Sequence, residues 1–231
     1  MRILLGIWIS VVIVLALTLP MVAQPQHWYE FPIIPGLGEK ARIIFFHVPT
    51  AWLSVVAFVS SMVFGIKYLR RGKIEDDVKS ASAASLGFLF CFLATVTGAL
   101  WAKFSWGTYW NWDPRETSIF VLLLIYGAYF ALRSAIDVEE KRASLSAVYS
   151  IIAAVTMPFF IFIMPRVLAS LHPEPILNAE GKVHMNGTML AVFFASLAGF
   201  TGLYAWIWNL HVRTQRIELA RTLEKGEPAR V

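Results

Sequence analysis

Residues 83–102, AASLGFLFCFLATVTGALWA, contain no Asp, Glu, Lys or Arg. A helix of about 20 predominantly apolar residues is long enough to cross the hydrocarbon core of a bilayer. The whole chain of 231 residues is 58% hydrophobic and 15% charged, whereas soluble domains carry about 25% charged residues. This composition excludes a disordered, collagenous or disulfide-rich chain and indicates an integral membrane protein.

Similar apolar runs recur along the chain and predict six membrane-spanning helices. Only one run contains a charged residue, Arg133, which lies near its end. The predicted fold class is therefore all-α: a polytopic membrane protein with six transmembrane helices in one domain, residues 1–212, followed by a cytoplasmic tail, residues 213–231. The predicted spans are Leu4–Val22, Ile44–Ile66, Ala83–Ala102, Thr117–Ile136, Leu145–Met164 and Thr188–Leu210.

The distribution of basic residues predicts the orientation. Most of the 20 Lys and Arg residues lie in segments 67–82, 133–142 and 213–231, on the side that also holds Arg2. The positive-inside rule places that side, and both termini, in the cytoplasm. The first run could instead be a signal peptide ending at Ala23, which would leave five spans without changing the side of any other loop. The outward loops are 23–43, 103–116 and 165–187.

The sequence lacks the common motifs that mark enzymes. Its single cysteine, Cys91, excludes an internal disulfide, a Cys-x-x-Cys redox pair and a Cys-x-x-Cys-His haem attachment site. We find no Ser/His/Asp or Cys/His constellation, no phosphate-binding loop and no dinucleotide fingerprint. We therefore expect a membrane protein without a recognisable catalytic constellation, and no nucleic acid as a partner.

The second outward loop is rich in tryptophan. Residues 101–116 read WAKFSWGTYWNWDPRE and hold four of the nine tryptophans of the chain. Trp and Tyr favour the headgroup level of any bilayer, so these residues could form part of an aromatic belt. Crowded into one loop, with Gly107 allowing a close approach of the backbone, they could equally form a stacking platform for a flat aromatic ligand. Residue types alone leave both interpretations open.

The end of this loop predicts a helix start. Asp113 is expected at the N-cap position, Pro114 at the first helical position and Glu116 at the third, ahead of the apolar run that begins at Thr117. This structural role holds whatever the loop binds. Arg115 would then lie on the first turn, where it could pair with an anionic ligand group or with lipid phosphate.

Four of the five histidines lie on the predicted outer side. A lone interfacial histidine is usually an amphipathic surface residue. Together with the tryptophan loop, however, two imidazoles would suit haem, an apolar macrocycle whose iron needs axial ligands and whose propionates need positive partners. A zinc site would more often bring Cys, carboxylates or more closely spaced histidines. The outward histidines are His27, His47, His172 and His184, and His211 lies at the cytoplasmic end of the last span.

Two motifs carry a family resemblance. Residues 106–115, WGTYWNWDPR, resemble the tryptophan-rich "WWD" signature of haem-handling proteins of cytochrome c maturation. Residues 47–52, HVPTAW, the six predicted spans and the chain length resemble those of the haem exporter protein C family, CcmC. The chain has no histidine in mid-membrane, unlike the larger relatives of the same superfamily, and this favours CcmC over them.

The resemblance implies a set of site residues. CcmC-type proteins lie in the bacterial inner membrane and hold haem b non-covalently on the periplasmic face, between two axial histidines. His47 matches the first ligand and His172 the second, with His184 as the less favoured substitute for His172. The matching motif residues are Trp106, Gly107, Trp110, Trp112, Asp113 and Arg115.

The resemblance also implies partners. CcmC-type proteins deliver haem to the periplasmic haem chaperone CcmE and act with CcmA, CcmB and CcmD of an ABC-type complex. Two other functions remain open from the residues. The chain could be a transport permease subunit for haem or another small molecule, although its spans show no polar pathway. It could also be a b-type electron-transfer subunit, although such proteins place paired histidines within their spans.

Overall fold

The computed structural model describes residues 2–173 and 183–224, and that part of the chain is mostly helical. The long helices are joined by short irregular loops, two paired strands, a 3-10 turn and one π-helical turn. The short elements are β1 (Met21–Val22), β2 (Phe31–Pro32), η1 (Gly38–Ile43), η2 (Phe159–Ile163) and α6 (Met164–Val167). The other helices are α1 (Arg2–Thr18), α2 (Ile44–Arg71), α3 (Ile74–Trp106), α4 (Pro114–Ser134), α5 (Glu139–Pro158) and α7 (Gly187–Glu224).

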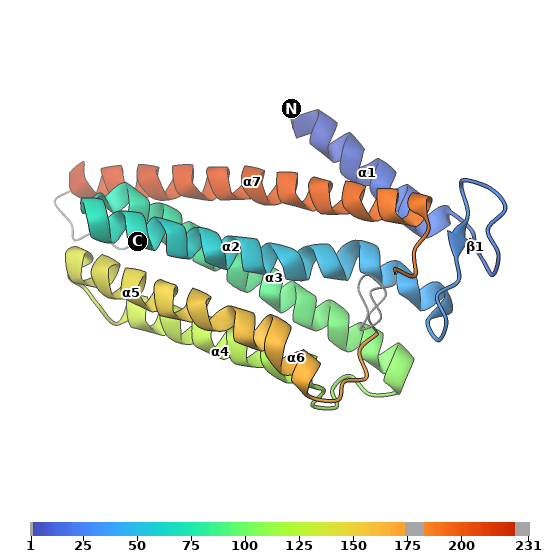
Figure 1. The fold of residues 1–231 in the computed structure, drawn as a ribbon. Coiled ribbons are helices and arrows are strands. Elements are labelled where there is room, and N and C mark those ends of the chain that lie inside the picture. Colours follow the sequence, from blue (N-terminus) through green and yellow to red (C-terminus); the bar gives the residue numbers. More distant parts are fainter. Residues whose placement is uncertain (1, 174–182, 225–231) are drawn as a thin grey trace.

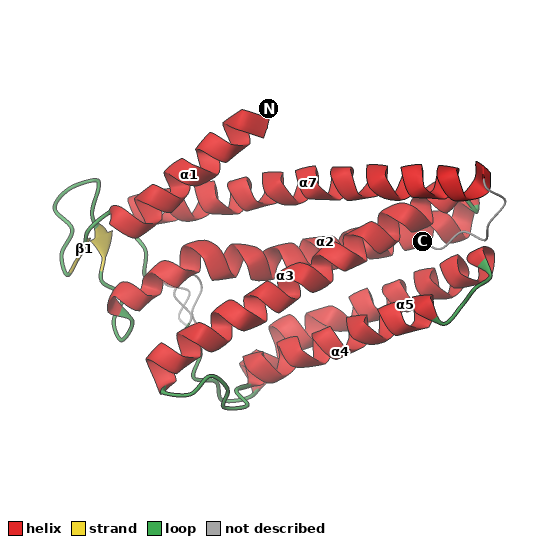
Figure 2. Cartoon of the chain, turned by 180° about the vertical axis from the view of Figure 1, so that it is seen from behind, coloured by secondary structure: helices red, strands yellow, loops and turns green. Residues whose placement is uncertain are grey.

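The helices form an elongated bundle with α2 and α3 in its middle. Helix α7 runs along one side of this pair and α4 with α5 along the other, and the same order is seen from behind (Figures 1 and 2). Helix α1 packs against α7, where Trp8 Nε1 donates to the Ala195 carbonyl at 2.9 Å. The described parts of the three loops predicted to face outward gather at one end of the bundle, which we call the loop end (Figure 1). We call the opposite end the basic end.

Five helices of the described chain are long and apolar enough to cross a membrane, which confirms a mostly helical, polytopic protein. Helix α1 is apolar but shorter, with 17 residues. It ends at Thr18 rather than at the predicted Val22, because Pro20 disfavours a helical residue before it. The prediction of six spans therefore has five clear counterparts in the structure.

Several helices extend beyond the apolar runs that predicted the spans. Helix α3 begins at Ile74 rather than at Ala83, since acidic residues in its first turn complement the helix dipole. Helix α5 ends at Pro158, and the chain continues through η2 and α6. Helix α7 continues past residue 212 without a break as far as Glu224, and residues 225–231 of the predicted tail lie outside the described residues.

Small residues allow α2 and α5 to approach each other closely. A Cβ at Gly65 of α2 would lie 2.7 Å from Ser150 Oγ and 3.3 Å from the Cα of Ala147, both on α5. Lipid chains are as apolar as leucine, so membrane helices associate mainly through such close packing. Two turns earlier on α2, the Phe58 ring stacks on Tyr126 of α4. These contacts fix the relative positions of α2, α4 and α5.

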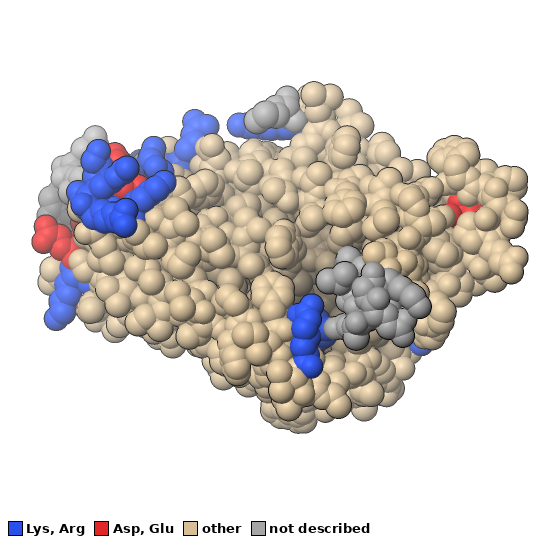
Figure 3. Space-filling model, viewed as in Figure 1, with Lys and Arg blue, Asp and Glu red and all other residues tan. Residues whose placement is uncertain are grey.

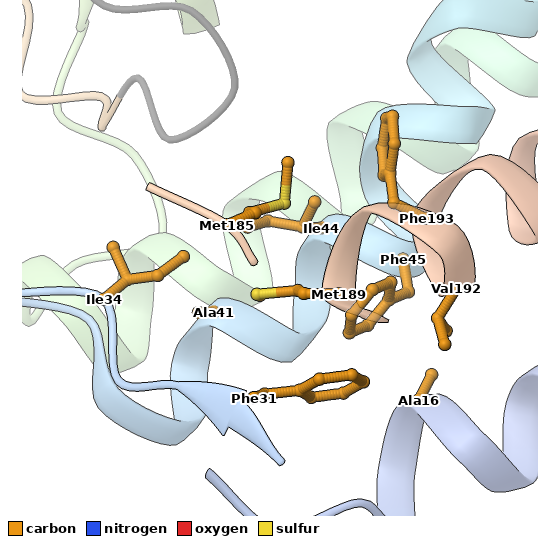
Figure 4. Close-up of a cluster of buried hydrophobic side chains, with 10 residues drawn as sticks. All are labelled: Ala16, Phe31, Ile34, Ala41, Ile44, Phe45, Met185, Met189, Val192 and Phe193. Atoms are coloured by element: carbon orange, nitrogen blue, oxygen red, sulfur yellow. The ribbon is translucent and has the colours of Figure 1, made fainter. Parts of the chain in front are cut away.

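A buried apolar cluster secures the first loop to the loop end of the bundle. It joins the end of α1, strand β2 and the first turns of α2 and α7, and Figure 4 shows Phe31 of β2 pointing toward Phe45 of α2 and Ala16 of α1. Arg42 adds polar contacts, because its guanidinium donates to the carbonyls of Ala16 and Leu19 at 2.8 Å. The start of α2 is therefore held in place by its neighbours.

The basic end carries most of the positive charge. Lys and Arg gather at this end of the molecule, on the left in Figure 3. Two of them are buried, Arg133 and Arg142. Arg133, at the end of α4, forms two hydrogen bonds of 2.8 and 2.9 Å with the carboxylate of Asp77 on α3. Both side chains are less than one-tenth exposed. This ion pair neutralises the one charge found within a predicted span and ties α3 to α4.

Replacing Arg133 by methionine should strongly destabilise the protein. The change leaves the Asp77 carboxylate buried without its partner, which typically costs about 3–5 kcal/mol. The double variant Asp77→Leu/Arg133→Met removes both charges and should recover most of the loss. Thermal unfolding in detergent measures both effects, with Arg71→Ala, an exposed cation at the end of α2, as the control. Equal melting temperatures for Arg133→Met and Arg71→Ala would contradict the role of the pair.

Candidate functional site

Two of the predicted ligands meet at the loop end. His47 lies in the second turn of α2, and His172 lies in the loop that follows α6. Their ring centroids are 6.5 Å apart, with 34° between the ring planes. Both side chains are half-buried. The structure thus brings together two imidazoles that are separated by more than a hundred residues of sequence.

The ring of His47 rests on α3. Its Nδ1 lies 2.9 Å from Thr97 Oγ1. At the next position, a Cβ on Gly98 would lie 3.1 Å from Cε1 of the ring. Glycine at this position therefore gives the imidazole room against the helix backbone, and the neighbouring hydroxyl bonds to the ring.

The loop of His172 is held by Asp113. The predicted capping box is confirmed: the carboxylate of Asp113 accepts a bond from the backbone N–H of Arg115 at 2.9 Å, and Glu116 bonds back to the backbone of Asp113. The same carboxylate also accepts bonds from the hydroxyl of Ser170 at 3.0 Å and from the backbone N–H of Leu171 at 2.8 Å. Asp113 therefore joins the tryptophan loop to the residues immediately before His172.

The series of hydrogen bonds from Asp113 through Ser170 continues to His172. The Ser170 hydroxyl oxygen accepts a bond from the backbone N–H of His172 at 3.1 Å. The ring Nδ1 of His172 lies 2.9 Å from the carbonyl oxygen of Pro173. Since a carbonyl can only accept, Nδ1 must carry the proton of the neutral ring. Nε2 of His172 is then the nitrogen with the lone pair.

The four tryptophans of the loop divide into two pairs. Trp101 lies 6.1 Å from the ring of His172 and meets Trp106 edge-on at 5.2 Å. Its Nε1 donates to the Lys40 carbonyl at 3.2 Å, which fixes the indole. Trp110 instead meets Trp112 at 5.8 Å and Phe120 of α4 at 6.1 Å. The first pair adjoins His172 through Trp101, and the second lies against the start of α4.

Trp112 has an unusual backbone conformation. Its φ of 62° is the only positive value at a non-glycine residue in the described part of the chain. Such a conformation typically costs about 1–3 kcal/mol and persists only where the surroundings hold it. Here Asn111 Oδ1 accepts from the backbone N–H of Asp113, and Thr117 Oγ1 donates to the Trp112 carbonyl. Trp112 is 67% exposed in this conformation.

The remaining predicted motif residues lie at the two ends of this loop. Gly107 ends α3 with a φ of 83°, a left-handed conformation that favours glycine. Arg115 is half-buried on the first turn of α4, as predicted. Lys103 is directed back onto the loop, because its Nζ donates to the Gly107 carbonyl at 2.9 Å.

The structure places His184 elsewhere. It lines a separate open cavity of about 500 Å³ at the loop end, together with His27 of the first loop. The rim of this cavity is held by Asn186, whose Nδ2 donates to the Glu30 carbonyl at 2.8 Å. The pKa of Glu30 lies below its usual range because the backbone N–H groups of His27 and Gln26 donate to its carboxylate. The geometry thus favours His172 over His184 as the partner of His47.

Sequence reasoning missed three contributors to this arrangement: Thr97, Trp101 as a neighbour of His172, and Ser170. Thr97 and Trp101 are four residues apart on α3, so they share one helix face. That spacing was visible in the sequence, but its relation to His47 depends on how α2 packs on α3. No local pattern marks Ser170.

We expect Asp113→Ala to release the loop before His172. The change removes the N-cap of α4, which typically contributes about 0.5–2 kcal/mol, and leaves the Leu171 N–H without its acceptor. Hydrogen exchange at residues 170–172 should become faster, with exchange at the basic end unchanged. Asp113→Asn keeps one acceptor oxygen and should give an intermediate result. Unchanged exchange at 170–172 in Asp113→Ala would contradict the linkage.

Known proteins are similar to this chain over most of its length. The family model described as heme exporter protein C matches residues 2–226. The chain is 32% identical over 184 residues to the heme exporter protein C of Bradyrhizobium diazoefficiens, covering 80% of this chain and 68% of that protein. It is 29% identical over 197 residues to that of Rhodobacter capsulatus, covering 85% and 81%. A ccmC-like mitochondrial protein of Marchantia polymorpha, described as putative in cytochrome c biosynthesis, is 30% identical over 72% of this chain and 71% of its own length. The chain therefore belongs to the CcmC family of heme exporter protein C.

Proposed function

We propose that this chain binds haem at the loop end of the bundle and delivers it to a periplasmic haem chaperone of the CcmE type during maturation of c-type cytochromes. The names of the relatives support a role in haem handling for cytochrome c biosynthesis. The observation that carries the proposal is the pairing of His47 with His172 at a ring-centroid distance of 6.5 Å.

This spacing fits a metal bound between the two rings. With metal–nitrogen bonds of about 2 Å on each side, the two ring centroids would lie roughly 6–6.5 Å apart. The bond from the His172 ring to Pro173 leaves the lone pair on Nε2, as a metal ligand requires. The iron of haem b, held without a covalent bond to the protein, would take one histidine on each face.

The aromatic residues would contact the macrocycle. Trp101 adjoins His172 and Trp106 packs against Trp101, so we assign these two indoles to the part of the porphyrin near the iron. A macrocycle extends beyond its iron on every side, and we assign Trp110 and Trp112 to its outer edge or to the approaching chaperone. Arg115, on the first turn of α4, would pair with a propionate.

The work of this chain would be to bind and orient its cargo. Haem and the chaperone supply the chemistry of covalent attachment, and this chain holds haem at the surface from which the chaperone can take it. The strained and exposed Trp112 supports such an outward-facing role. We assign no catalytic residue.

We propose an orientation with the loop end in the periplasm. The gathering of Lys and Arg at the basic end supports it. Helix α1, although short, would be the sixth span, and both termini would lie on the cytoplasmic side of the bacterial inner membrane. The exposed apolar surfaces of the helices would contact lipid, and CcmA, CcmB and CcmD would be the partners within an ABC-type complex.

Haem binding should depend on both histidines. We expect the purified protein to show a visible spectrum of six-coordinate haem, and His47→Ala or His172→Ala to convert it to a five-coordinate form. The double variant should lose the haem bands, because the iron then has no protein ligand. His184→Ala is the matched control, from the same loop, and should leave the spectrum unchanged. Unchanged bands in the double variant, or loss of the bands in His184→Ala alone, would contradict the assignment.

Delivery should be visible on the chaperone. In cells that produce both proteins, covalent haem on the chaperone should fall sharply with the His47→Ala/His172→Ala variant, while the amount of chaperone stays constant. Haem staining after denaturing electrophoresis measures this. Undiminished covalent haem on the chaperone, combined with haem flux into empty proteoliposomes that contain only this chain, would support a transport permease instead.

A further inference from the structure

We propose that Thr97 is a positioning residue for His47: it holds the neutral ring as the tautomer that carries its proton on Nδ1, so that Nε2 presents a lone pair to the iron. This inference rests on the proposed role of His47 as a haem ligand. It adds a residue of α3 that lies outside the tryptophan loop and outside the two histidine motifs.

The hydrogen bonds of the Thr97 hydroxyl determine the tautomer of the His47 ring. The Thr97 hydroxyl has a single proton, and its Oγ1 lies 2.8 Å from the Leu93 carbonyl and 3.2 Å from the Ala94 carbonyl. Carbonyl oxygens only accept, so the hydroxyl proton is directed to the helix backbone. Towards His47 Nδ1, at 2.9 Å, the Thr97 oxygen is therefore the acceptor. Nδ1 must donate, and the lone pair of the neutral ring lies on Nε2.

The backbone around Thr97 restricts the ring further. The Cε1 edge of His47 lies against Gly98, where an added Cβ would be 3.1 Å away. The ring is thus held at Nδ1 by a hydroxyl and along one edge by the helix backbone. Both contacts come from α3, the helix that packs most extensively on α2. A ligand held by rigid helices keeps its geometry better than one held by loops.

The hydrogen bond between His47 Nδ1 and the Thr97 hydroxyl affects how the other ring nitrogen can bind a metal. Histidines that bind metals usually donate their other ring N–H to a neighbouring acceptor, which fixes the tautomer and makes the ligating nitrogen more basic. Losing such a partner typically lowers metal affinity by about 10- to 100-fold. The other ligand follows the same scheme, because His172 Nδ1 donates to the Pro173 carbonyl.

Neighbouring threonines provide a matched comparison. Thr95 lies two residues earlier on α3, and its hydroxyl bonds to the Cys91 carbonyl of the same helix at 2.9 Å. Thr97 makes the same kind of bond to Leu93 and in addition meets a ring nitrogen from another helix. Replacing either threonine by valine removes a hydroxyl at nearly constant volume, but only the change at Thr97 removes a partner of His47.

The first test uses the protein without haem. In protein labelled with ¹⁵N-histidine, NMR shifts of the ring nitrogens distinguish the two neutral tautomers, and His47→Ala assigns the signal. We expect a proton on Nδ1 of His47 in the wild type. Thr97→Val should yield a mixture of tautomers, whereas Thr97→Ser should restore the wild-type signal and Thr95→Val should leave it unchanged. A wild-type proton on Nε2 would overturn the proposal, even if a variant failed to fold.

The second test uses the haem-loaded protein. Thr97→Val should weaken haem binding by about 10- to 100-fold and shift the reduction potential to a more positive value, because a less basic ligand stabilises ferric iron less. Thr97→Ser should recover both properties. Values for Thr97→Val equal to those for Thr95→Val would overturn the role of Thr97 and leave haem binding by His47 intact. Failure of the wild type to bind haem would overturn the proposed function, while the tautomer measurement would still decide the role of Thr97.

Discussion

The carboxylate of Asp113 is the interaction on which the loop end of the molecule depends. Asp113 is only 5% exposed, and its carboxylate caps α4 and accepts hydrogen bonds from the Ser170 hydroxyl and from the Leu171 backbone N–H. A charged acceptor forms stronger hydrogen bonds than a neutral one, and here one such acceptor serves two loops. Without it, the tryptophan loop and the loop of His172 would have no common support, and the second imidazole would have no fixed place opposite the first.

The two imidazoles are held in different ways. His47 belongs to α2, whose start is fixed by a buried apolar cluster and whose ring rests on Thr97 and Gly98 of α3. His172 belongs to a loop that returns to the bundle through Ser170 and Asp113. One imidazole is therefore part of the helix bundle, and the other is held by a short series of hydrogen bonds.

The sequence predicted the parts of this protein that follow from local pattern. Apolar runs predicted the long helices, and the order Asp113, Pro114, Glu116 predicted the start of α4, both confirmed by the structure. The polar turns at the start of α3 and the end of α7 lie outside the apolar runs, so the runs alone did not show how far these helices extend. The contacts of Thr97 with His47 and of Ser170 with Asp113 join elements far apart in sequence, and only the packing of α2 on α3 and the return of the chain after α6 create them. The family resemblance already favoured His172 over His184, and the structure adds that His172, not His184, has its ring beside that of His47.

The most direct measurement is an experimental structure of the haem-loaded protein in a lipid nanodisc. We predict iron between His47 and His172, with Nε2 of each ring within about 2.1 Å of the metal and the indoles of Trp101 and Trp106 against the macrocycle. Density for the porphyrin in the cavity between His27 and His184, or within the spans away from both predicted ligands, would contradict the central claim.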